Sequence, residues 1–228
     1  GIAFDGDGDR VAFVDQSGSP LTGEESTWIL MQSLREELLG QEMVYDVKMS
    51  DVIAAAATDL GARPCVERSG HAFIRARMIA LDACFGAELS GHYFHRELDG
   101  GDDGLFTACR MITFLAAEDA PLSHLRLGCP AIFATSDLRL QVRSSDQDGV
   151  VGQVQQGFRQ FPQRFTDGVR IDFKKGWGLI RKSVTEEALT FRFEGADQVA
   201  LEEVVALFSD KLGSRGKELW QQFEERAG

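Results

Sequence analysis

The chain has 228 residues, 43% of them hydrophobic and 26% charged, which is enough apolar material for one large core or two smaller ones. Its 36 acidic and 24 basic side chains give a formal net charge of −12, which would repel nucleic acids and anionic membranes from most of the surface. No apolar run approaches the roughly 20 residues of a membrane span, and the four cysteines form no CxxC pair. We therefore expect a soluble, cytoplasmic protein that binds neither nucleic acid nor membrane.

The first 19 residues have the pattern of a short β-hairpin. Residues 1–4 and 10–15 are strand-like, and residues 16–20 form a turn cluster of Gln, Ser, Gly and Pro. Because an isolated two-stranded hairpin is only marginally stable in water, we expect it to join a larger sheet. Residues 1–19 are therefore predicted to be the C-terminal hairpin of an incomplete domain.

Helical and strand patterns alternate over the next hundred residues. Helices are predicted over residues 24–39, 51–60, 71–81 and 103–117, and strands over 43–47, 64–67 and 85–89. Ser50 is the predicted N-cap of the second helix. Repeated β–α units predict that residues 20–128 form an α/β domain, with a mixed, mostly parallel sheet and helices on both faces.

The pattern changes near residue 129. A strand is predicted over residues 131–142, a glutamine-rich helix over 150–161, two or three strands between 169 and 194, and helices over 198–212 and 217–226. This order predicts a smaller α+β C-terminal domain, residues 129–228.

The densest chemical signal is the sequence DGDGDR at residues 5–10. Asp5, Asp7 and Asp9 would repel one another unless a cation lies between them, and the intervening glycines allow a tight turn that aims all three at one point. Such oxygen ligands suit Mg²⁺ or Ca²⁺. A calcium-binding EF-hand loop needs a bidentate Glu at its twelfth position, where this chain has Gln16. The loop therefore favours a metal that keeps coordination places open for a phosphate.

Two further polar segments follow predicted strands, at the edge of the sheet where α/β domains bind ligands. Glu88 and Ser90 are two residues apart, so they point to the same side of an extended segment and suit two neighbouring hydroxyls of a sugar. His92 has a side chain that transfers protons near neutral pH. Taken alone, this segment fits an ordinary polar turn equally well. The turn at residues 68–71 is a weak candidate anion site at a helix N-terminus.

The sequence GWGLIRKSVT at residues 176–185 is a local basic segment in an acidic chain. Arg181, Ser183 and Thr185 alternate, so a guanidinium and two hydroxyls are able to surround one phosphate. An exposed basic edge strand accounts for the same pattern equally well. His95 and His124 have no supporting context, and we assign both to the surface.

In this order, the segments resemble the α-D-phosphohexomutase superfamily, and most of all its bacterial phosphomannomutase/phosphoglucomutase branch. The matching segments are DGDGDR, SGH at residues 69–71, GAELSGH at 86–92, GDDG at 101–104 and GWGLIRKS at 176–183. The resemblance implies a four-domain enzyme, of which this chain supplies the end of the metal-binding domain 2, the sugar-recognition domain 3 and the phosphate-binding domain 4. It also implies that the missing N-terminal domains are partners of this chain.

The resemblance implies interconversion of hexose 1-phosphate and 6-phosphate, with mannose, glucose or both as the sugar. The phosphoryl group is carried by a phosphoserine, and a hexose 1,6-bisphosphate is the intermediate and activator. The family's phosphoserine loop, Thr-x-Ser-His-Asn, does not occur here. We therefore expect the chain to be inactive on its own.

Roles for individual residues follow from the same resemblance. Mg²⁺ at the three aspartates holds the phosphoserine. Arg10 and His92 are catalytic, with His92 the candidate general acid/base. The implied substrate-binding residues are Lys48, His71, Glu88, Ser90, Arg181, Ser183 and Thr185.

Two positions depart from the family pattern. Val184 stands where the family usually has Asn, and Glu187 where it usually has Pro, and both changes are expected to weaken phosphate binding. Two alternative functions stay open at this point. One is a haloacid-dehalogenase-type sugar phosphatase with Asp5 as nucleophile and Asp102-Asp103 as the second acidic motif. The other is a non-catalytic sugar-phosphate-binding fragment.

Overall fold

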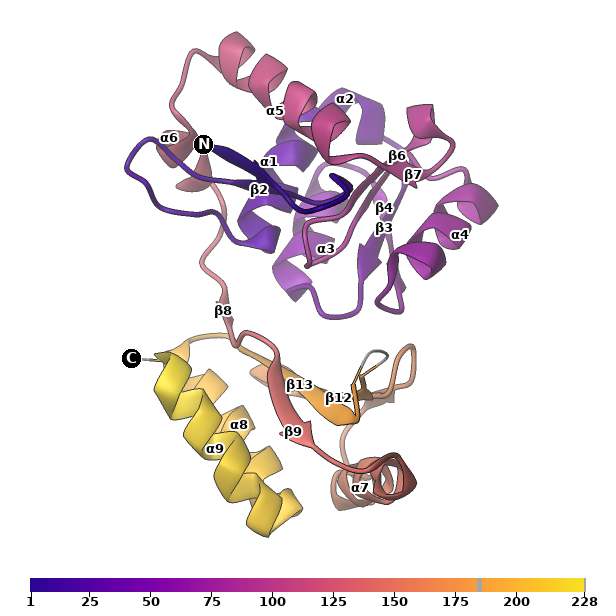
Figure 1. Ribbon diagram of the computed structural model, residues 1–228, viewed down its shortest axis with the longest axis vertical. Helices are drawn as coiled ribbons and strands as arrows, with labels where there is room; N and C mark the ends of the chain where they lie inside the picture. The colour runs from indigo at the N-terminus through magenta and orange to yellow at the C-terminus, as the bar shows by residue number, and fades with distance from the viewer. Residues whose placement is uncertain (184–185, 228) are drawn as a thin grey trace. The chain divides into compact units, whose positions relative to one another are not determined.

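Residues 1–183 and 186–227 are described by a computed structural model, in which the chain divides into unit 1, Gly1–Pro130, and unit 2, Ala131–Gly228. Val184 and Thr185 lie outside the described residues. Figure 1 shows the elements of both units. Within the described residues, every helix is too short or too polar to cross a bilayer.

Unit 1 is built on a five-stranded sheet of order β4-β3-β5-β6-β7. The strands are β3 (Glu42–Asp46), β4 (Arg63–Glu67), β5 (Phe85–Ala87), β6 (Tyr93–His95) and β7 (Gly101–Asp102). Strands β4 and β5 run parallel to β3, whereas β6 is antiparallel to both β5 and β7. Within this sheet β6 alone is reversed, which confirms the prediction of a mixed, mostly parallel sheet.

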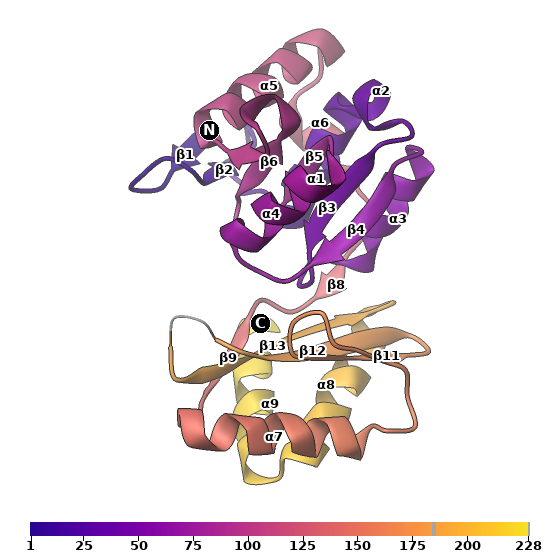
Figure 2. The same ribbon diagram turned by 90° about the vertical axis from the view of Figure 1, so that its right-hand side faces the viewer.

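Helices cover both faces of this sheet (Figure 2). They are α1 (Gly23–Ser33), α2 (Arg35–Leu38), α3 (Asp51–Asp59), α4 (His71–Leu81), α5 (Gly104–Glu118) and α6 (Leu122–Arg126), with a 3₁₀ turn at Arg96–Leu98. Alternation along β3 explains the two layers: Met43 joins the core on the α1 and α3 side, whereas Val44 packs with Ile74 of α4. Ser50 caps α3 as predicted, because its hydroxyl accepts from Val52 N at 3.1 Å.

The helix predicted over residues 24–39 is interrupted. Leu34 has φ −107° and ψ 10°, outside the helical range, so the segment forms α1 and α2 instead. The start of α1 is fixed by a capping box, in which Thr22 Oγ1 accepts from Glu25 N and the Glu25 carboxylate accepts from Thr22 N.

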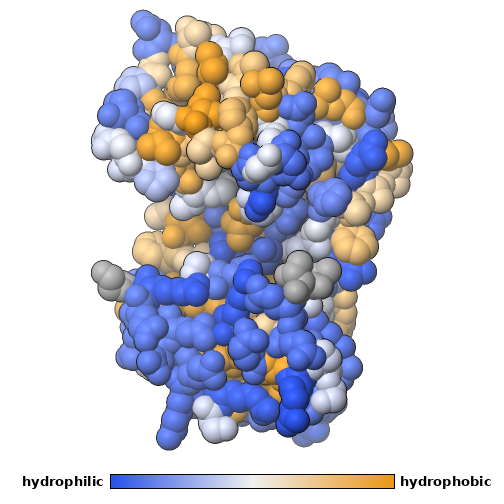
Figure 3. All heavy atoms as spheres, in the orientation of Figure 1, coloured by the Kyte–Doolittle hydropathy of each residue, from blue (hydrophilic) through white to orange (hydrophobic). Residues whose placement is uncertain are grey.

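The N-terminal hairpin consists of β1 (Ile2–Phe4) and β2 (Val11–Phe13), which pair antiparallel. Val11 and Phe13 are buried in the core of unit 1, and Val11 N donates to Gly91 O at 3.1 Å. By contrast, Ile2 and Phe4 on β1 are 40% and 45% exposed. Figure 3 shows hydrophobic side chains gathered over this part of unit 1, near α5.

Unit 2 is an antiparallel sheet backed by three helices, α7 (Ser144–Gly157), α8 (Gln198–Leu212) and α9 (Ser214–Ala227). Its strands are β8 (Phe133–Ala134), β9 (Leu138–Gln141), β10 (Gln163–Arg164), β11 (Val169–Phe173), β12 (Gly176–Lys182) and β13 (Ala188–Gly195). They pair in the order β10-β11-β12-β13-β8, and β9 also pairs with β13. Figure 2 shows the helices on one face of the sheet, where Ile180, Phe193 and Phe208 share a core.

The α+β prediction for this unit is confirmed, although several elements differ from the predicted ranges. The strand predicted over residues 131–142 is divided into β8 and β9. The glutamine-rich helix begins six residues earlier than predicted, at Ser144, and ends at Gly157. Val150 and Val154 of this helix are both buried.

Candidate active site

The loop between β1 and β2 folds around the carboxylate of Asp5. Gly8 has φ +81°, a conformation that glycine adopts without steric cost, and its N donates to Asp5 Oδ1 at 3.2 Å. Arg10 donates to the same carboxylate through its backbone N at 3.2 Å and through Nε at 2.6 Å. Burial opposes the ionisation of Asp5, but the hydrogen bonds and charge of Arg10 prevail and lower the pKa of Asp5 to about 2.

The three aspartates of this loop converge as predicted. Asp5, Asp7 and Asp9 each offer a carboxylate oxygen, and these oxygens all lie within 4.8 Å of one another. Asp9 Oδ1 is buried and accepts no hydrogen bond from the described residues. Burial and the charges of Asp7, Asp5 and Asp102 raise the pKa of Asp9, against the opposing charge of His92. A set of carboxylate oxygens, one of them buried and without a hydrogen-bond donor among the described residues, fits a hard divalent cation such as Mg²⁺.

The side chain of His92 lies beside this cluster, on the segment that joins β5 to β6. Its Nδ1 is 2.7 Å from Asp102 Oδ2 and 3.9 Å from Asp9 Oδ2. Burial lowers the pKa of His92, but the hydrogen bond to Asp102 and the charges of Glu88, Asp9 and Asp102 outweigh it, so the pKa is raised. The ring of His71, the first residue of α4, is stacked 6.1 Å away between centroids.

Glu88 follows β5 and is 8% exposed. Its backbone N donates to His92 O at 2.9 Å, which closes the turn that carries the exposed Ser90. Burial and the charge of Asp46 raise the pKa of Glu88, against opposing effects of His92, Lys48 and a hydrogen bond from Ser90. A ligand that donates a hydrogen bond to such a buried carboxylate would stabilise it.

The sequence alone did not identify Asp46, the last residue of β3. It is fully buried, and its Oδ1 accepts from Ser69 Oγ at 2.5 Å and from Lys48 N at 3.0 Å. Lys48 Nζ lies 3.9 Å from Asp46 Oδ2. Asp46 therefore ties the end of β3 to the turn before α4. The sequence does hold one signal that points to Asp46: it is an acidic residue at the end of a buried parallel strand, where α/β domains bind ligands.

These contacts bring together the predicted site residues of unit 1. They lie at the carboxyl ends of β3, β4 and β5 and on the β1–β2 loop, and comprise Asp5, Asp7, Asp9, Arg10, Lys48, His71, Glu88, Ser90 and His92. Arg10 is also linked to the group through the backbone, as it forms an isolated β-bridge with His92.

In unit 2, Arg181 lies on β12 and Ser183 immediately follows that strand. Arg181 Nε donates to Asp167 Oδ2 at 2.7 Å. Ser183 Oγ accepts from Glu186 N at 3.3 Å. Thr185, the third residue predicted to bind phosphate, lies outside the described residues.

The carboxylate at Glu187, one of the departures from the expected pattern, has a partner of its own. Its Oε1 accepts from Ser144 Oγ at 2.7 Å and from Ser144 N at 3.3 Å, at the start of α7. These bonds lower the pKa of Glu187, so the group is held ionised at a helix N-terminus.

The assignment of His95 to the surface was wrong. Its side chain is 1% exposed, because all three residues of β6 are buried and the strand has no solvent face. Thr107 Oγ1 donates to Asp103 O, so it accepts from His95 Nε2 at 2.9 Å. Burial and the charge of Arg110 lower the pKa of His95 to about 4.

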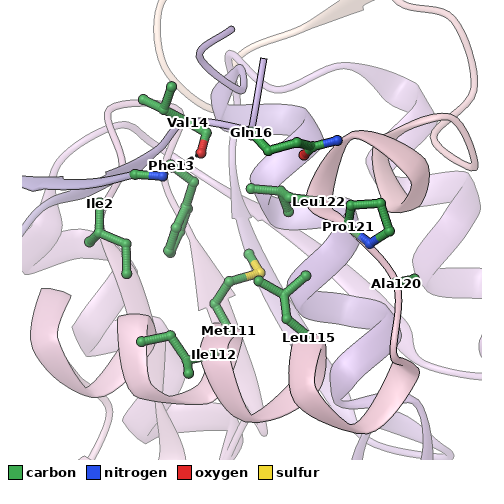
Figure 4. Close-up of a pocket in the computed structure, with 11 residues that line it drawn as sticks. Ile2, Phe13, Val14, Gln16, Met111, Ile112, Leu115, Ala120, Pro121 and Leu122 are labelled. Atoms are coloured by element: carbon green, nitrogen blue, oxygen red, sulfur yellow. Dashed lines mark hydrogen bonds between the residues drawn. The ribbon is translucent and has the colours of Figure 1, made fainter. Parts of the chain in front are cut away.

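A separate pocket of about 300 Å³ lies between the hairpin and helices α5 and α6 (Figure 4). Phe13, Met111 and Leu115 point into it, and none of the predicted site residues lines it. Its apolar lining distinguishes it from the polar cluster at the strand ends.

Comparison with known families agrees with this arrangement. Residues 22–131 match the phosphoglucomutase/phosphomannomutase α/β/α domain III, and residues 138–211 match the C-terminal domain of the same family. The chain belongs to this family. The match is to the superfamily that the motifs resembled.

Individual relatives support the assignment. The phosphomannomutase/phosphoglucomutase of Pseudomonas aeruginosa is 30% identical over 215 residues, which are 93% of this chain and 46% of that protein. The crystal structure of a Burkholderia thailandensis family member has a TM-score of 0.84 at 28% identity and covers 95% of this chain and 46% of that one. The chain thus spans about half the length of these relatives.

A more distant likeness concerns the fold alone. The structure of Aspergillus fumigatus N-acetylphosphoglucosamine mutase, solved with GlcNAc-6P and magnesium, has a TM-score of 0.66 at 12% identity. It covers 94% of this chain and 48% of that one.

Proposed function

We propose that this chain is the sugar- and phosphate-binding part of a phosphohexomutase that interconverts hexose 1-phosphate and 6-phosphate through a phosphoserine and a hexose 1,6-bisphosphate. The observation that carries the proposal is the juxtaposition in unit 1 of a three-carboxylate loop, the buried Glu88 and the imidazole of His92. Each matches a need of that reaction: a cation for a phosphate, an acceptor for sugar hydroxyls and a group that moves a proton. Membership of the mutase family supports the same reading.

In this proposal Asp5, Asp7 and Asp9 hold Mg²⁺. The cation supplies positive charge to a phosphoryl group, as hard divalent ions do when carboxylates leave coordination places open. Arg10 orders the loop, because its side chain and backbone N both bind Asp5.

Glu88 and Ser90 are assigned to sugar hydroxyls. Burial raises the pKa of the Glu88 carboxyl, so hydrogen-bond donors from a ligand stabilise its ionised form. Two neighbouring hydroxyls of a sugar supply such donors. Lys48 and His71 are assigned to the substrate as cationic or polar contacts at the same strand ends. His92 is assigned to the proton that a sugar hydroxyl loses when it accepts a phosphoryl group.

Arg181, Ser183 and Thr185 are assigned to the phosphate that does not react. Arg181 supports this role through its planar guanidinium, whose donors match phosphate oxygens in pairs. Because Asp167 engages Nε, the two Nη groups are the ones assigned to the ligand.

We also propose that residues 1–19 complete a domain whose other part lies outside this chain. The exposed apolar side chains of Ile2 and Phe4 support this proposal, since a strand face of that kind is normally covered. The proposed N-terminal domains would supply both the cover and the phosphoserine. The incomplete domain and the cytoplasmic location of the protein both stay predictions.

The test is a mutase assay of a longer polypeptide that carries this chain together with the segments that complete the relatives' length. We expect conversion of mannose or glucose 1-phosphate in the presence of Mg²⁺ and a hexose 1,6-bisphosphate, and no turnover by the 228-residue chain alone. Glu88→Gln should impair activity, whereas Glu36→Gln on the exposed surface of α2 should not. Turnover by the isolated chain, or equal activity of both variants, would overturn the proposal.

A further inference from the structure

Asp102 has no role in the function proposed above, although it makes the shortest polar contact of His92. It is the last residue of β7, directly before Asp103, the N-cap of α5. Its Oδ2 lies 2.7 Å from His92 Nδ1, and the two side chains are 14% and 13% exposed. Strand pairing of β6 with β7 brings together two residues that are ten positions apart in the chain.

This hydrogen bond selects one form of the neutral imidazole. An ionised carboxylate only accepts hydrogen bonds, so His92 Nδ1 must carry the proton. Nε2 is then the unprotonated ring nitrogen, able to accept a proton from a ligand hydroxyl. Within the described residues, Asp102 is the hydrogen-bond partner of the ring, since Asp9 Oδ2 is 3.9 Å away.

The rest of the surroundings fix where the ring lies but not which nitrogen is protonated. The backbone of His92 is held by Glu88 N and by the bridge to Arg10. The rings of His71 and Phe94 lie at 6.1 and 6.3 Å between centroids. Packing of this kind orients a ring, whereas only a hydrogen-bonding group distinguishes its two nitrogens.

We propose that Asp102 is a positioning residue that holds His92 in the Nδ1-protonated form and so presents Nε2 as the proton acceptor toward the sugar hydroxyl. The proposal rests on the proposed function of His92. In the half-reaction concerned, the hydroxyl proton passes to Nε2 while its oxygen forms the new bond to phosphorus. The bond from phosphorus to the serine oxygen breaks, its electron pair stays on that oxygen, and the oxygen takes up a proton from solvent. The imidazolium returns its own proton to solvent before the next half-reaction. Asp102 keeps its charge throughout and stabilises the imidazolium that results.

The first test uses the 228-residue chain and does not depend on activity. Nitrogen-15 NMR of the His92 ring, recorded at alkaline pH where a neutral imidazole is expected, should show a proton on Nδ1. Asp102→Ala should move the population toward the Nε2-protonated form. The control is Asp103→Asn, which makes the same change of charge one residue away and retains a side chain that caps helices. A wild-type ring protonated on Nε2, or no change in Asp102→Ala, would overturn the proposal.

The second test uses the longer polypeptide described above. Asp102→Asn should lower kcat by about 10²-fold, at the lower end of what proton transfer by a side chain typically contributes. KM should stay within about threefold, because Glu88 and Ser90 are unchanged, and Asp103→Asn should behave as wild type. An unchanged kcat, or a loss confined to KM, would overturn the positioning role. Absence of mutase activity in the wild type would instead overturn the proposed function, and the NMR result would still decide the protonation of His92.

Discussion

Arg181 and Asp167 form an ion pair on the sheet of unit 2, with Arg181 Nε 2.7 Å from Asp167 Oδ2 and side-chain exposures of 9% and 10%. Asp167 is followed by Gly168, whose φ is +77°. A Cβ at Gly168 would lie 2.1 Å from Ile180 O and 2.8 Å from Arg181 Cα. The turn that carries Asp167 therefore passes directly against the backbone of Arg181, and the ion pair holds the guanidinium at this turn.

The first prediction concerns phosphate binding by unit 2. Arg181→Ala should weaken binding of a hexose phosphate to the chain by about 10- to 150-fold, because a charge-assisted contact is worth ~1.5–3 kcal/mol. Arg181→Lys should not restore affinity, because an ammonium does not reproduce paired planar donors. Isothermal calorimetry provides the measurement. The matched control is Lys182→Ala, which removes an exposed neighbouring cation paired with Asp148. Arg181→Ala with affinity within about twofold of wild type would contradict the assignment.

The second prediction compares two glycines of unit 2. Gly168→Ala should destabilise the unit by at least about 1–3 kcal/mol, since it forces a side chain into a left-handed conformation and against the backbone of Ile180. Gly149→Ala should instead stabilise by about 0.5–1 kcal/mol, because Gly149 lies within α7 and an added Cβ there would enter open space. Urea dependence of amide hydrogen exchange in β12 and β13 measures both. Equal effects of the two substitutions would refute the role given to the turn.

The third prediction concerns pH and His95. The folded pKa of His95 is lowered to about 4, so the unfolded chain binds a proton at higher pH than the folded chain does. The contribution of His95 to the free energy of unfolding is therefore complete above about pH 6.5, and it is lost as the pH drops toward 4. Between pH 7.5 and pH 5 the contribution of His95 amounts to about 2 kcal/mol.

Amide exchange in β3 and β5 reports this effect in unit 1. His95→Gln lacks the titrating group, so its loss of stability over the same pH range should be smaller than that of the wild type by about 2 kcal/mol. Identical pH dependence in the two proteins would show that His95 does not exchange its proton on unfolding as described.

The fourth prediction concerns the aspartate loop. Mg²⁺ should bind the isolated chain weakly, since this ion usually relies on phosphate oxygens in addition to carboxylates. Asp7→Asn should weaken the binding further, by about 10-fold or more, through loss of a charged ligand. Asp99→Asn, on an exposed turn far along the sequence, is the control. Tight binding without phosphate, or binding unaffected by Asp7→Asn, would argue against a metal site at this loop.

The sequence predicted those features that depend on neighbours along the chain. Ser50 and the helix it caps, the alternation of β and α elements, and the convergence of Asp5, Asp7 and Asp9 all follow from local pattern and turn chemistry. Local pattern does not predict the roles of Asp46, Asp102 and Asp167, because each binds a partner that only the tertiary fold brings near. His95 was misassigned for a related reason. A short strand buried on both faces has no polar alternation to reveal it.

The central claim is that the phosphoryl group moves between two positions of one sugar and is not released to water. Phosphorus-31 NMR of mannose 1-phosphate, incubated with the longer polypeptide, Mg²⁺ and a trace of hexose 1,6-bisphosphate, tests it in a single sample. We expect the 1-phosphate signal to be replaced by that of the 6-phosphate, with the total sugar phosphate constant. Growth of an inorganic phosphate signal in place of the 6-phosphate would contradict the account.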